Sequence, residues 1–299
     1  MQNQISPLKI NDLIYFTAPA KSIDQESVLY AKQFFEEKGY RVLLSKHCLG
    51  VYNYFSGTDE ERIEDMQAGI DNPEVKAIIC ARGGYGAVRI VDRIQWATQL
   101  LRPKWIVGFS DITVFHQKMH CFGINSIHAT MPLNYAKNSP ESFSTLLAAL
   151  SKTPYSIEYP SSSHSKFGSV NGILVGGNLS ILYSLLGTDD QIEYSDTILF
   201  IEDVGEQLYN IDRMLFAFKK AGVFNKIKGL IVGGMTELKD TDTSIGFTFE
   251  QLVLSQFEYR SIPIAFGFPA GHITDNRALV FGEKVEFTVN EKSTTLKFR

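Results

Sequence analysis

The pattern of hydrophobic and polar positions in the first half of the chain alternates short apolar runs with longer amphipathic stretches. Such runs are typical of buried strands, and the stretches between them have the period of helices. The expected strands are LIYFTA (13–18), RVLLS (41–45), VKAIICA (75–81), WIVGF (105–109) and NSIHA (125–129). The expected helices run from about Gln25 to Lys38, onward from Thr58, onward from Asp111, and from about Glu141 to Leu150. This order predicts a Rossmann-like N-terminal domain with a doubly wound parallel sheet.

The second half repeats the alternation in a shorter form. Strands are expected at ILFIED (198–203) and GLIVGG (229–234), and helices from about 210 to 221 and from 249 to 259. The tail VEFTVNEKSTTLKF alternates in polarity, which predicts a final hairpin. Its loop type stays open, because NEK is not a two-residue Asn-Gly turn. The fold class is therefore α/β, with a second, smaller α/β C-terminal domain.

A stretch rich in Ser, Pro and Gly separates the two halves. The segment SKTPYSIEYPSSSHSKFGS (151–169) has no sustained apolar period. We therefore predict an N-terminal domain over residues 1–155, a linker over 156–170 and a C-terminal domain over 171–299.

Composition narrows the classes of partner. With 44% hydrophobic residues in 299, the chain can build a large core, and its net charge of -4 lacks the basic excess of a nucleic-acid binder. No apolar stretch reaches the roughly 18 residues of a membrane span, and the start lacks the pattern of a signal peptide, so we expect a cytoplasmic protein without a membrane partner. The 3 cysteines form no CxxC pair, which favours reduced thiols over disulfides or structural zinc.

A candidate nucleophile lies where WIVGF runs directly into a helix start. Ser110 would project at a sharp turn above the carboxyl edge of the sheet, as in a nucleophile elbow, although the spacing is not GxSxG. Backbone N–H groups of the next helical turn would there be able to stabilise an oxyanion. From the pattern alone, a helix cap made by Ser110 or Asp111 is the commoner explanation.

A catalytic serine needs a base and a group that orients the base. His272 lies in a loop just past the strand IPIAFGF, where a ligand-facing residue is expected. His128 also follows a strand and is a second candidate for the pocket, although a satisfied buried histidine is the commoner case. Glu202 and Asp203 end the apolar run ILFIED, and Glu206 follows in the same turn. The residues alone do not rank these three carboxylates.

Two glycine clusters are candidate ligand contacts. ARGGYG (81–86) follows a strand and precedes a helix, so its N–H groups can approach an anion closely, as an oxyanion or carboxylate cradle. It lacks the spacing of a dinucleotide fingerprint and the Lys-Ser/Thr of a P-loop. GILVGGNLS (172–180) would end a short strand and begin a helix capped near Asn178, where domain packing explains it as readily as substrate contact.

Five motifs taken together resemble the L,D-carboxypeptidase family, which includes microcin-immunity peptidases. The motifs are ARGGYGAVRI, GFSDIT, GGNLS, LFIEDVGE with NIDRML, and GHITDN. Their order and spacing match the family across nearly the whole chain. The resemblance implies two domains with the active site between them, usually a homodimer, and no metal or organic cofactor.

The resemblance also implies roles for individual residues. Ser110 would be the nucleophile, His272 the general base and Glu202 the residue that orients the base. The expected oxyanion donors are the backbone N–H groups of Gly84 and Asp111. Four further residues are expected to bind substrate: Arg82, Gly83, Tyr85 and His128. Among them, Arg82 is one candidate for binding a free carboxylate of the substrate. One departure is the sequence His-Ala-Thr-Met at 128–131, where the family commonly has His-Gly-Pro-Met.

The activity implied by the resemblance is removal of the terminal D-alanine from murein tetrapeptides in cell-wall recycling. The third residue of this small peptide, lysine or diaminopimelate, and the need for an attached sugar stay open. Within the family, the alternative is hydrolysis of an aminoacyl-adenylate-like antibiotic, for which 207–209 supplies one aromatic residue, Tyr209. Alternatives from other classes are a non-catalytic protein that binds an anionic ligand and a Rossmann-type nucleotide enzyme, although the latter lacks the glycine fingerprint.

Overall fold

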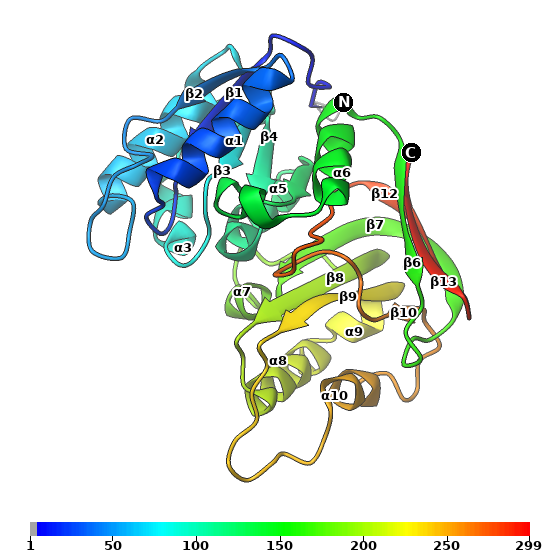
Figure 1. Ribbon diagram of the computed structural model, residues 1–299. Coiled ribbons are helices and arrows are strands. Elements are labelled where there is room, and N and C mark those ends of the chain that lie inside the picture. Colours follow the sequence, from blue (N-terminus) through cyan, green and yellow to red (C-terminus); the bar gives the residue numbers. More distant parts are fainter. Residues whose placement is uncertain (1–4) are drawn as a thin grey trace.

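The computed structural model describes residues 5–299, which form two β-sheets with helices packed on them (Figure 1). The blue-to-cyan part of the chain builds the first sheet, and most of the green-to-red part builds the second. This two-domain α/β architecture, with a Rossmann-like parallel sheet in the N-terminal part, is the one predicted from the sequence. No helix within residues 5–299 has the length and apolar character needed to cross a membrane.

The first sheet has 6 strands in the order β11-β5-β4-β3-β1-β2. Its strands are β1 (Leu13–Thr17), β2 (Arg41–Leu44), β3 (Val75–Cys80), β4 (Trp105–Gly108), β5 (Ser126–His128) and β11 (Leu279–Phe281). Strands β1 to β5 run parallel, and β11 pairs antiparallel with β5. Every residue of β1 and β4 is buried, as expected for parallel strands covered on both faces.

Three of the helices described in the first half begin at a capping side chain. They are α1 (Gln25–Glu37), α2 (Asp59–Asp71), α3 (Ala87–Ile90), α4 (Ala97–Leu101), α5 (Thr113–Cys121) and α6 (Pro140–Ser151), with short 3-10 turns η1 (Val91–Arg93), η2 (Ser110–Ile112) and η3 (Pro132–Lys137). The side chains of Asp24, Thr58 and Ser139 accept backbone hydrogen bonds at the starts of α1, α2 and α6. Thr58 forms a reciprocal capping box with Glu61.

The second sheet has 7 strands in the order β10-β9-β8-β7-β12-β13-β6. Its strands are β6 (Tyr155–Pro160), β7 (Gly168–Asn178), β8 (Thr197–Val204), β9 (Gly229–Thr236), β10 (Ile264–Ala265), β12 (Lys284–Val289) and β13 (Ser293–Phe298). Strands β7 to β10 are parallel, whereas β12, β13 and β6 are antiparallel. The predicted C-terminal hairpin is confirmed, because β12 pairs with β13. The helices of this half are α7 (Leu179–Ser184), α8 (Leu208–Lys220), α9 (Val223–Lys226) and α10 (Phe249–Ser255).

The segment between the two halves contains regular structure. Most of β6 and the start of β7 fall within residues 156–170, which the composition predicts to be a linker. β6 pairs with β13 at the edge of the second sheet. The chain therefore enters the second sheet at its far edge before it returns toward the centre in β7. The domain boundaries drawn from the sequence stay a prediction.

The two halves share a hydrophobic core. One cluster of buried apolar side chains extends through the first half and includes Phe200, Ile231 and Phe268 from the second. β11 comes late in the chain but completes the first sheet beside β5. The second cluster gathers side chains from β7, β8 and β9 and from α7, α8 and α10. The shared core and β11, the strand that crosses from the second half of the chain into the first sheet, hold the two sheets against each other.

Candidate active site

Ser110 occupies a sharp turn at the carboxyl end of β4. The strand ends at Gly108, and Ser110 begins the 3-10 turn that leads into α5. Its backbone φ is +63°, a conformation that residues other than glycine adopt rarely and that recurs at functional turns. The side chain is half-buried. This is the geometry predicted for Ser110, a serine presented between a buried strand and a helix.

A buried histidine on α5 holds the strand end that precedes this turn. His116 Nε2 lies 2.9 Å from the Gly108 carbonyl oxygen, and its Nδ1 lies 2.8 Å from Ser126 Oγ. Burial lowers the pKa of His116 to about 4, so the ring is neutral. Nε2–H therefore donates to the carbonyl while Nδ1 accepts from the hydroxyl. The residues around His116 in the sequence do not indicate this role, because its partners lie on β4 and β5.

His272 and Glu202 form the shortest contact at the site. His272 lies in the loop between β10 and β11, and Glu202 is a fully buried residue of β8. His272 Nδ1 and Glu202 Oε2 are 2.6 Å apart. Burial alone would lower the pKa of His272, but the hydrogen bond and charge of Glu202 outweigh it and raise that pKa above its ordinary value. With Nδ1–H donated to the carboxylate, Nε2 is left as the accepting atom.

A glycine makes this close approach possible. Gly271 precedes His272 with a φ of +106°, and a Cβ at this position would lie 2.8 Å from Glu202 Cβ. Its N–H donates to Asn276 Oδ1 over 2.8 Å. Thr236 Oγ1 donates to the His272 carbonyl over 3.3 Å. The loop is thus held from both sides, with the imidazole directed at the strand carboxylate.

The contacts of the three carboxylates that the sequence left unranked distinguish Glu202 from the other two. Asp203 accepts hydrogen bonds from Asn178 Nδ2 at 2.9 Å and from Ser180 Oγ at 2.7 Å. Glu206 lies 3.3 Å from the Ser180 hydroxyl. Within residues 5–299, Glu202 is the carboxylate of the three that contacts the imidazole. In the second glycine cluster Asn178 caps α7, and a Cβ on Gly177 would lie 2.6 Å from Thr113 Cγ2, so the glycine admits a close approach of α5.

The nucleophile turn and the histidine loop are in contact. The ring of Phe109, the residue before Ser110, packs against the His272 ring with a centroid distance of 4.9 Å. In the part of the chain that the structure describes, no hydrogen bond joins Ser110 Oγ to the imidazole. Catalytic hydrogen bonds often tighten only when substrate binds. The structure thus joins His272 and Glu202 and places the histidine loop against Phe109, the residue before Ser110.

The first glycine cluster passes directly beside the nucleophile turn. A Cβ on Gly83 would lie 3.1 Å from Ser110 Cβ and 3.3 Å from the Asp111 backbone nitrogen. Gly84, with φ +108°, is exposed, and a Cβ there would lie 2.9 Å from Lys21 Cβ. The backbone groups predicted to bind the oxyanion, those of Gly84 and Asp111, therefore belong to segments that adjoin Ser110.

The other predicted substrate contacts are placed less uniformly. Arg82 is half-buried, and its Nη1 donates to the Ser22 carbonyl over 3.0 Å. Tyr85 is exposed on the glycine loop. His128 has 0% exposure and lies behind Phe109, with its ring centroid 5.7 Å away. Burial holds the pKa of His128 well below its ordinary value. This placement gives no support to a direct contact between His128 and a substrate.

Two family models match the chain. The model of the LD-carboxypeptidase N-terminal domain matches residues 14–129, and that of the LD-carboxypeptidase C-terminal domain matches residues 171–287. These matches and the fold define a peptidase built from two α/β domains. The chain belongs to the LD-carboxypeptidase family, and the resemblance carried by its motifs is confirmed.

The sequence of the chain is similar to those of individual family members over nearly its full length. A probable murein peptide carboxypeptidase of Bacillus subtilis is 30% identical over 305 residues, with 97% of this chain and 93% of the relative covered. The murein tetrapeptide carboxypeptidase of Pseudomonas aeruginosa is 27% identical over 286 residues, with 92% of each covered.

Solved structures give the same picture. The muramoyltetrapeptide carboxypeptidase from Oxalobacter formigenes superposes with a TM-score of 0.87 at 28% identity, covering 95% of this chain and 98% of the other. MccF in complex with glutamyl sulfamoyl guanosine gives a TM-score of 0.88 at 20% identity over 99% of both chains, which is a likeness of fold alone.

Proposed function

We propose that this protein is a serine-type L,D-carboxypeptidase that releases the terminal D-alanine of murein tetrapeptides in cell-wall recycling. The observation that carries the proposal is the 2.6 Å contact between His272 Nδ1 and the buried Glu202 carboxylate, beside the turn that presents Ser110. A base oriented by a third group and adjacent to a hydroxyl is the arrangement of nucleophilic acyl transfer. The named activities of the relatives support the substrate class.

The reaction follows from these positions. Ser110 Oγ attacks the carbonyl carbon of the L-residue, and His272 Nε2 takes the hydroxyl proton. Backbone N–H groups of Gly84 and Asp111 stabilise the oxyanion. When the intermediate collapses, the C–N bond breaks and the imidazolium gives its proton to the leaving amine of D-alanine. Water, deprotonated by His272, then hydrolyses the acyl-enzyme and regenerates the serine.

An exopeptidase also needs a group that recognises the free carboxylate of the departing residue. One cation lies in the glycine loop and a second lies beside it. Arg82 gives one donor to Ser22 and keeps others, and Lys21 extends past Gly84 with its ammonium 4.7 Å from the Tyr54 ring centroid. Either cation is suited to pair with a carboxylate. We propose Arg82 as the first residue to test, since its planar fork binds a carboxylate in two places.

The decisive experiment measures D-alanine released from a murein tetrapeptide, with mass spectrometry as readout. We expect release by the wild type, and a loss of several powers of ten in Ser110→Ala. Ser144→Ala, an exposed serine of α6, is the matched control and should release D-alanine at the wild-type rate. Undiminished release by Ser110→Ala would reject the nucleophile assignment. No release by the wild type would reject the murein substrate.

A second candidate substrate is an aminoacyl-adenylate-like antibiotic. The observation in its favour is Tyr209, which stays 43% exposed at the start of α8, three residues beyond Glu206, where its ring is able to stack on a nucleobase. Incubating the enzyme with a glutamyl sulfamoyl nucleoside beside the tetrapeptide distinguishes the two. Cleavage of the nucleoside conjugate with no release of D-alanine would replace the murein proposal by this one.

The proposal includes a cytoplasmic location and a homodimer. Light scattering on the purified protein measures the second of these, since a dimer doubles the chain mass of 33.6 kDa. Tetrapeptides with lysine or diaminopimelate at the third position, each with and without the sugar, define the substrate further.

A further inference from the structure

A buried arginine lies behind the glycine loop. Arg62, on α2, is 1% exposed and is among the largest fully buried side chains of the described residues. In the sequence it stands in the polar run DEERIED, where a solvated role is expected. Its spacing from Met66 and Ile70 places it on the buried face of the helix. The mechanism above gives this charge no task.

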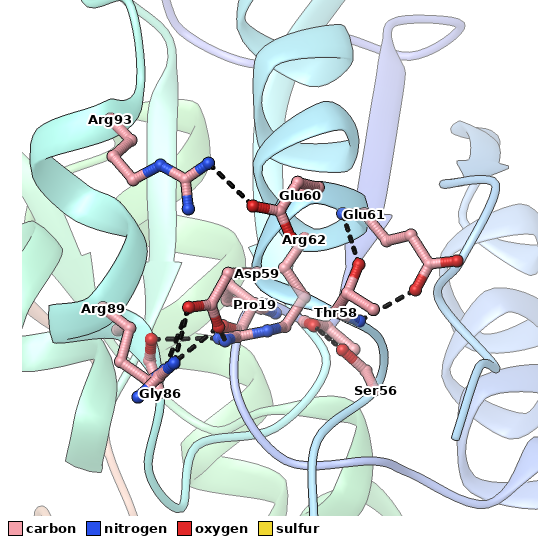
Figure 2. A network of polar contacts seen from close by, with 12 residues as sticks. Pro19, Ser56, Thr58, Asp59, Glu60, Glu61, Arg62, Gly86, Arg89 and Arg93 are labelled. Atoms are coloured by element: carbon pink, nitrogen blue, oxygen red, sulfur yellow. Dashed lines mark hydrogen bonds and ion pairs between the residues drawn. The ribbon is translucent and has the colours of Figure 1, made fainter. Parts of the chain in front are cut away.

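Arg62 joins three separate segments of the chain (Figure 2). Its Nη1 donates to the carbonyls of Pro19, at 2.6 Å, and Gly86, at 2.9 Å. Its Nη2 donates to the Asp59 carboxylate at the start of α2. The guanidinium carbon lies 4.7 Å from the Phe55 ring centroid. The chain after β1, the start of α2 and the end of the glycine loop are therefore fixed to one rigid, planar group.

The Gly86 carbonyl belongs to the same peptide group as the Ala87 N–H. That N–H donates to Asp111 Oδ2 over 2.8 Å, and Asp111 directly follows Ser110. Arg62 therefore holds one end of the peptide and Asp111 holds the other. A Cβ on Gly86 would lie 2.6 Å from Arg62 Nη1, so only glycine admits the guanidinium here.

The buried contacts that Arg62 and Asp111 make with the Gly86–Ala87 peptide make a movement of the glycine loop costly. Asp111 is 1% exposed, and its burial raises its pKa, against which the Ala87 N–H and the Arg62 charge favour the ionised form. Arg62 and Asp111 are thus two buried ionisable groups with one peptide group between them. A shift of the glycine loop would cost Arg62 its bond to the Gly86 carbonyl and Asp111 its bond from the Ala87 N–H, and a buried polar group that loses a partner is destabilising.

We propose that Arg62 is a positioning residue, which acts through the Gly86–Ala87 peptide and Asp111 to hold the glycine loop against the nucleophile turn. The N–H of Gly84 is then kept at the place where an oxyanion forms on the Ser110 adduct. The proposal rests on the proposed function for the role of Ser110. What it adds to that mechanism is a cation on α2, Arg62, that fixes the position of the oxyanion donors.

A merely structural arginine would behave differently. Its loss would lower the stability of the fold and leave the rate per folded molecule unchanged. Loss of a positioning residue lowers kcat and leaves KM nearly unchanged, because the misplaced donor acts on the transition state more than on bound substrate. The rate at which a fluorophosphonate modifies Ser110 reports the same geometry without any peptide substrate.

The test compares Arg62→Ala and Arg62→Lys with Arg93→Ala. Arg93 is half-exposed in the same network and bonds only Glu60 in Figure 2, so it is the matched control. We expect Arg62→Ala to lower both kcat and the labelling rate by about 100-fold, the scale of one lost oxyanion donor, with KM within about threefold. Arg62→Lys should lie between, since an ammonium lacks the fork that reaches both carbonyls and Asp59. Arg93→Ala should stay within about twofold of the wild type, as a surface pair does.

Chemical rescue adds a readout that a structural role would not move. Millimolar guanidinium should restore part of the labelling rate of Arg62→Ala and leave Arg93→Ala unchanged. A folded Arg62→Ala with wild-type kcat and labelling rate would overturn the proposal. Where Arg62→Ala does not fold, a wild-type rate in Arg62→Lys overturns it equally. A wild type that is labelled but releases no D-alanine rejects the murein substrate alone, whereas a wild type that is not labelled overturns the positioning role.

Discussion

At the scale of single residues, the site depends on how a buried carboxylate controls an imidazole. Glu202 is fully buried, and an unpaired charge in such a place is costly, so its contact with His272 is strongly maintained. The same contact fixes the tautomer of the ring. Orientation and proton affinity of the base therefore have one common source.

Replacing Glu202 by glutamine separates these two effects. A general base must be neutral, so kcat/KM falls as the pH drops through the pKa of His272. Because the carboxylate raises that pKa, Glu202→Gln should move the acidic limb of the profile to lower pH. The plateau should fall by roughly 10²- to 10⁴-fold, because the amide no longer enforces the tautomer.

Glu237→Gln is the matched control for that measurement. Glu237 acts on His272 through its charge, with no hydrogen bond among the causes of the pKa shift. The limb should move in the same direction by less, and the plateau should be retained. An acidic limb that stays in place, or moves to higher pH, in Glu202→Gln would contradict the assignment of Glu202.

Gly83 tests the contact between the glycine loop and the nucleophile. Gly83→Ala places a methyl group 3.1 Å from Ser110 Cβ and 3.3 Å from the Asp111 nitrogen, which must displace one of the two segments. We expect kcat to fall on the order of 100-fold, measured with the tetrapeptide. Gly246→Ala, where a Cβ meets nothing within 4 Å, should keep the wild-type kcat even if its positive φ costs stability. Equal rates in the two variants would exclude close packing at Gly83.

The sequence predicts some of these residues better than others. The turn at Ser110 follows from a strand that runs directly into a helix, and the structure places it there. Glu202 could not be separated from Asp203 and Glu206, because their partners, Asn178 and Ser180, come from another strand and helix. Spacing along one segment carries no information on such contacts.

At the scale of elements, two helices begin with the same device. α2 and α10 each have a threonine N-cap and a reciprocal bond from the third helical residue, which is Glu61 in α2 and Gln251 in α10. Both caps satisfy backbone N–H groups that the helix leaves free. The start of α2 has the sequence pattern of such a cap, because Thr58 is followed by three acidic residues.

The two caps should contribute similarly to stability. Thr58→Ala and Thr248→Ala are each expected to lower the free energy of unfolding by about 1 kcal/mol, as measured by urea denaturation. Thr243→Ala, at an exposed position outside the helices, should stay within about 0.5 kcal/mol of the wild type. A loss in Thr243→Ala as large as in the two cap variants would show that the effect is not one of capping.

Short strands, and strands whose partners lie far away in the sequence, are the elements that the sequence pattern predicts least well. β11 has 3 residues, too few for a period to emerge, and it pairs with a strand about 150 positions earlier. β6 lies in a stretch whose serines and prolines favour a loop, yet pairing with β13 makes it a strand. Tertiary pairing overrides local preference at both places.

At the scale of the whole molecule, the two sheets are expected to unfold together. The shared hydrophobic cluster and the crossing strand β11 couple them. Both tryptophans, Trp96 and Trp105, lie in the first half, so their fluorescence reports that half, whereas far-UV circular dichroism reports both. We predict coincident urea transitions by the two probes. Transitions with clearly different midpoints would mean that the halves unfold independently.

The crossing of β11 has a consequence for synthesis on the ribosome. β5 is complete about 150 residues before β11 emerges, an interval of about 8 to 30 s at ordinary elongation rates. Throughout that time β5 is an open edge of the nascent first sheet, and its N–H and C=O groups on that side are unpaired. In the folded protein every residue of β5 is buried. A chain that stops short of residue 279 never closes that edge. Premature termination between β10 and β11 therefore yields a product that contains the strands up to β10 but keeps this edge of the first sheet open, which makes it prone to aggregate.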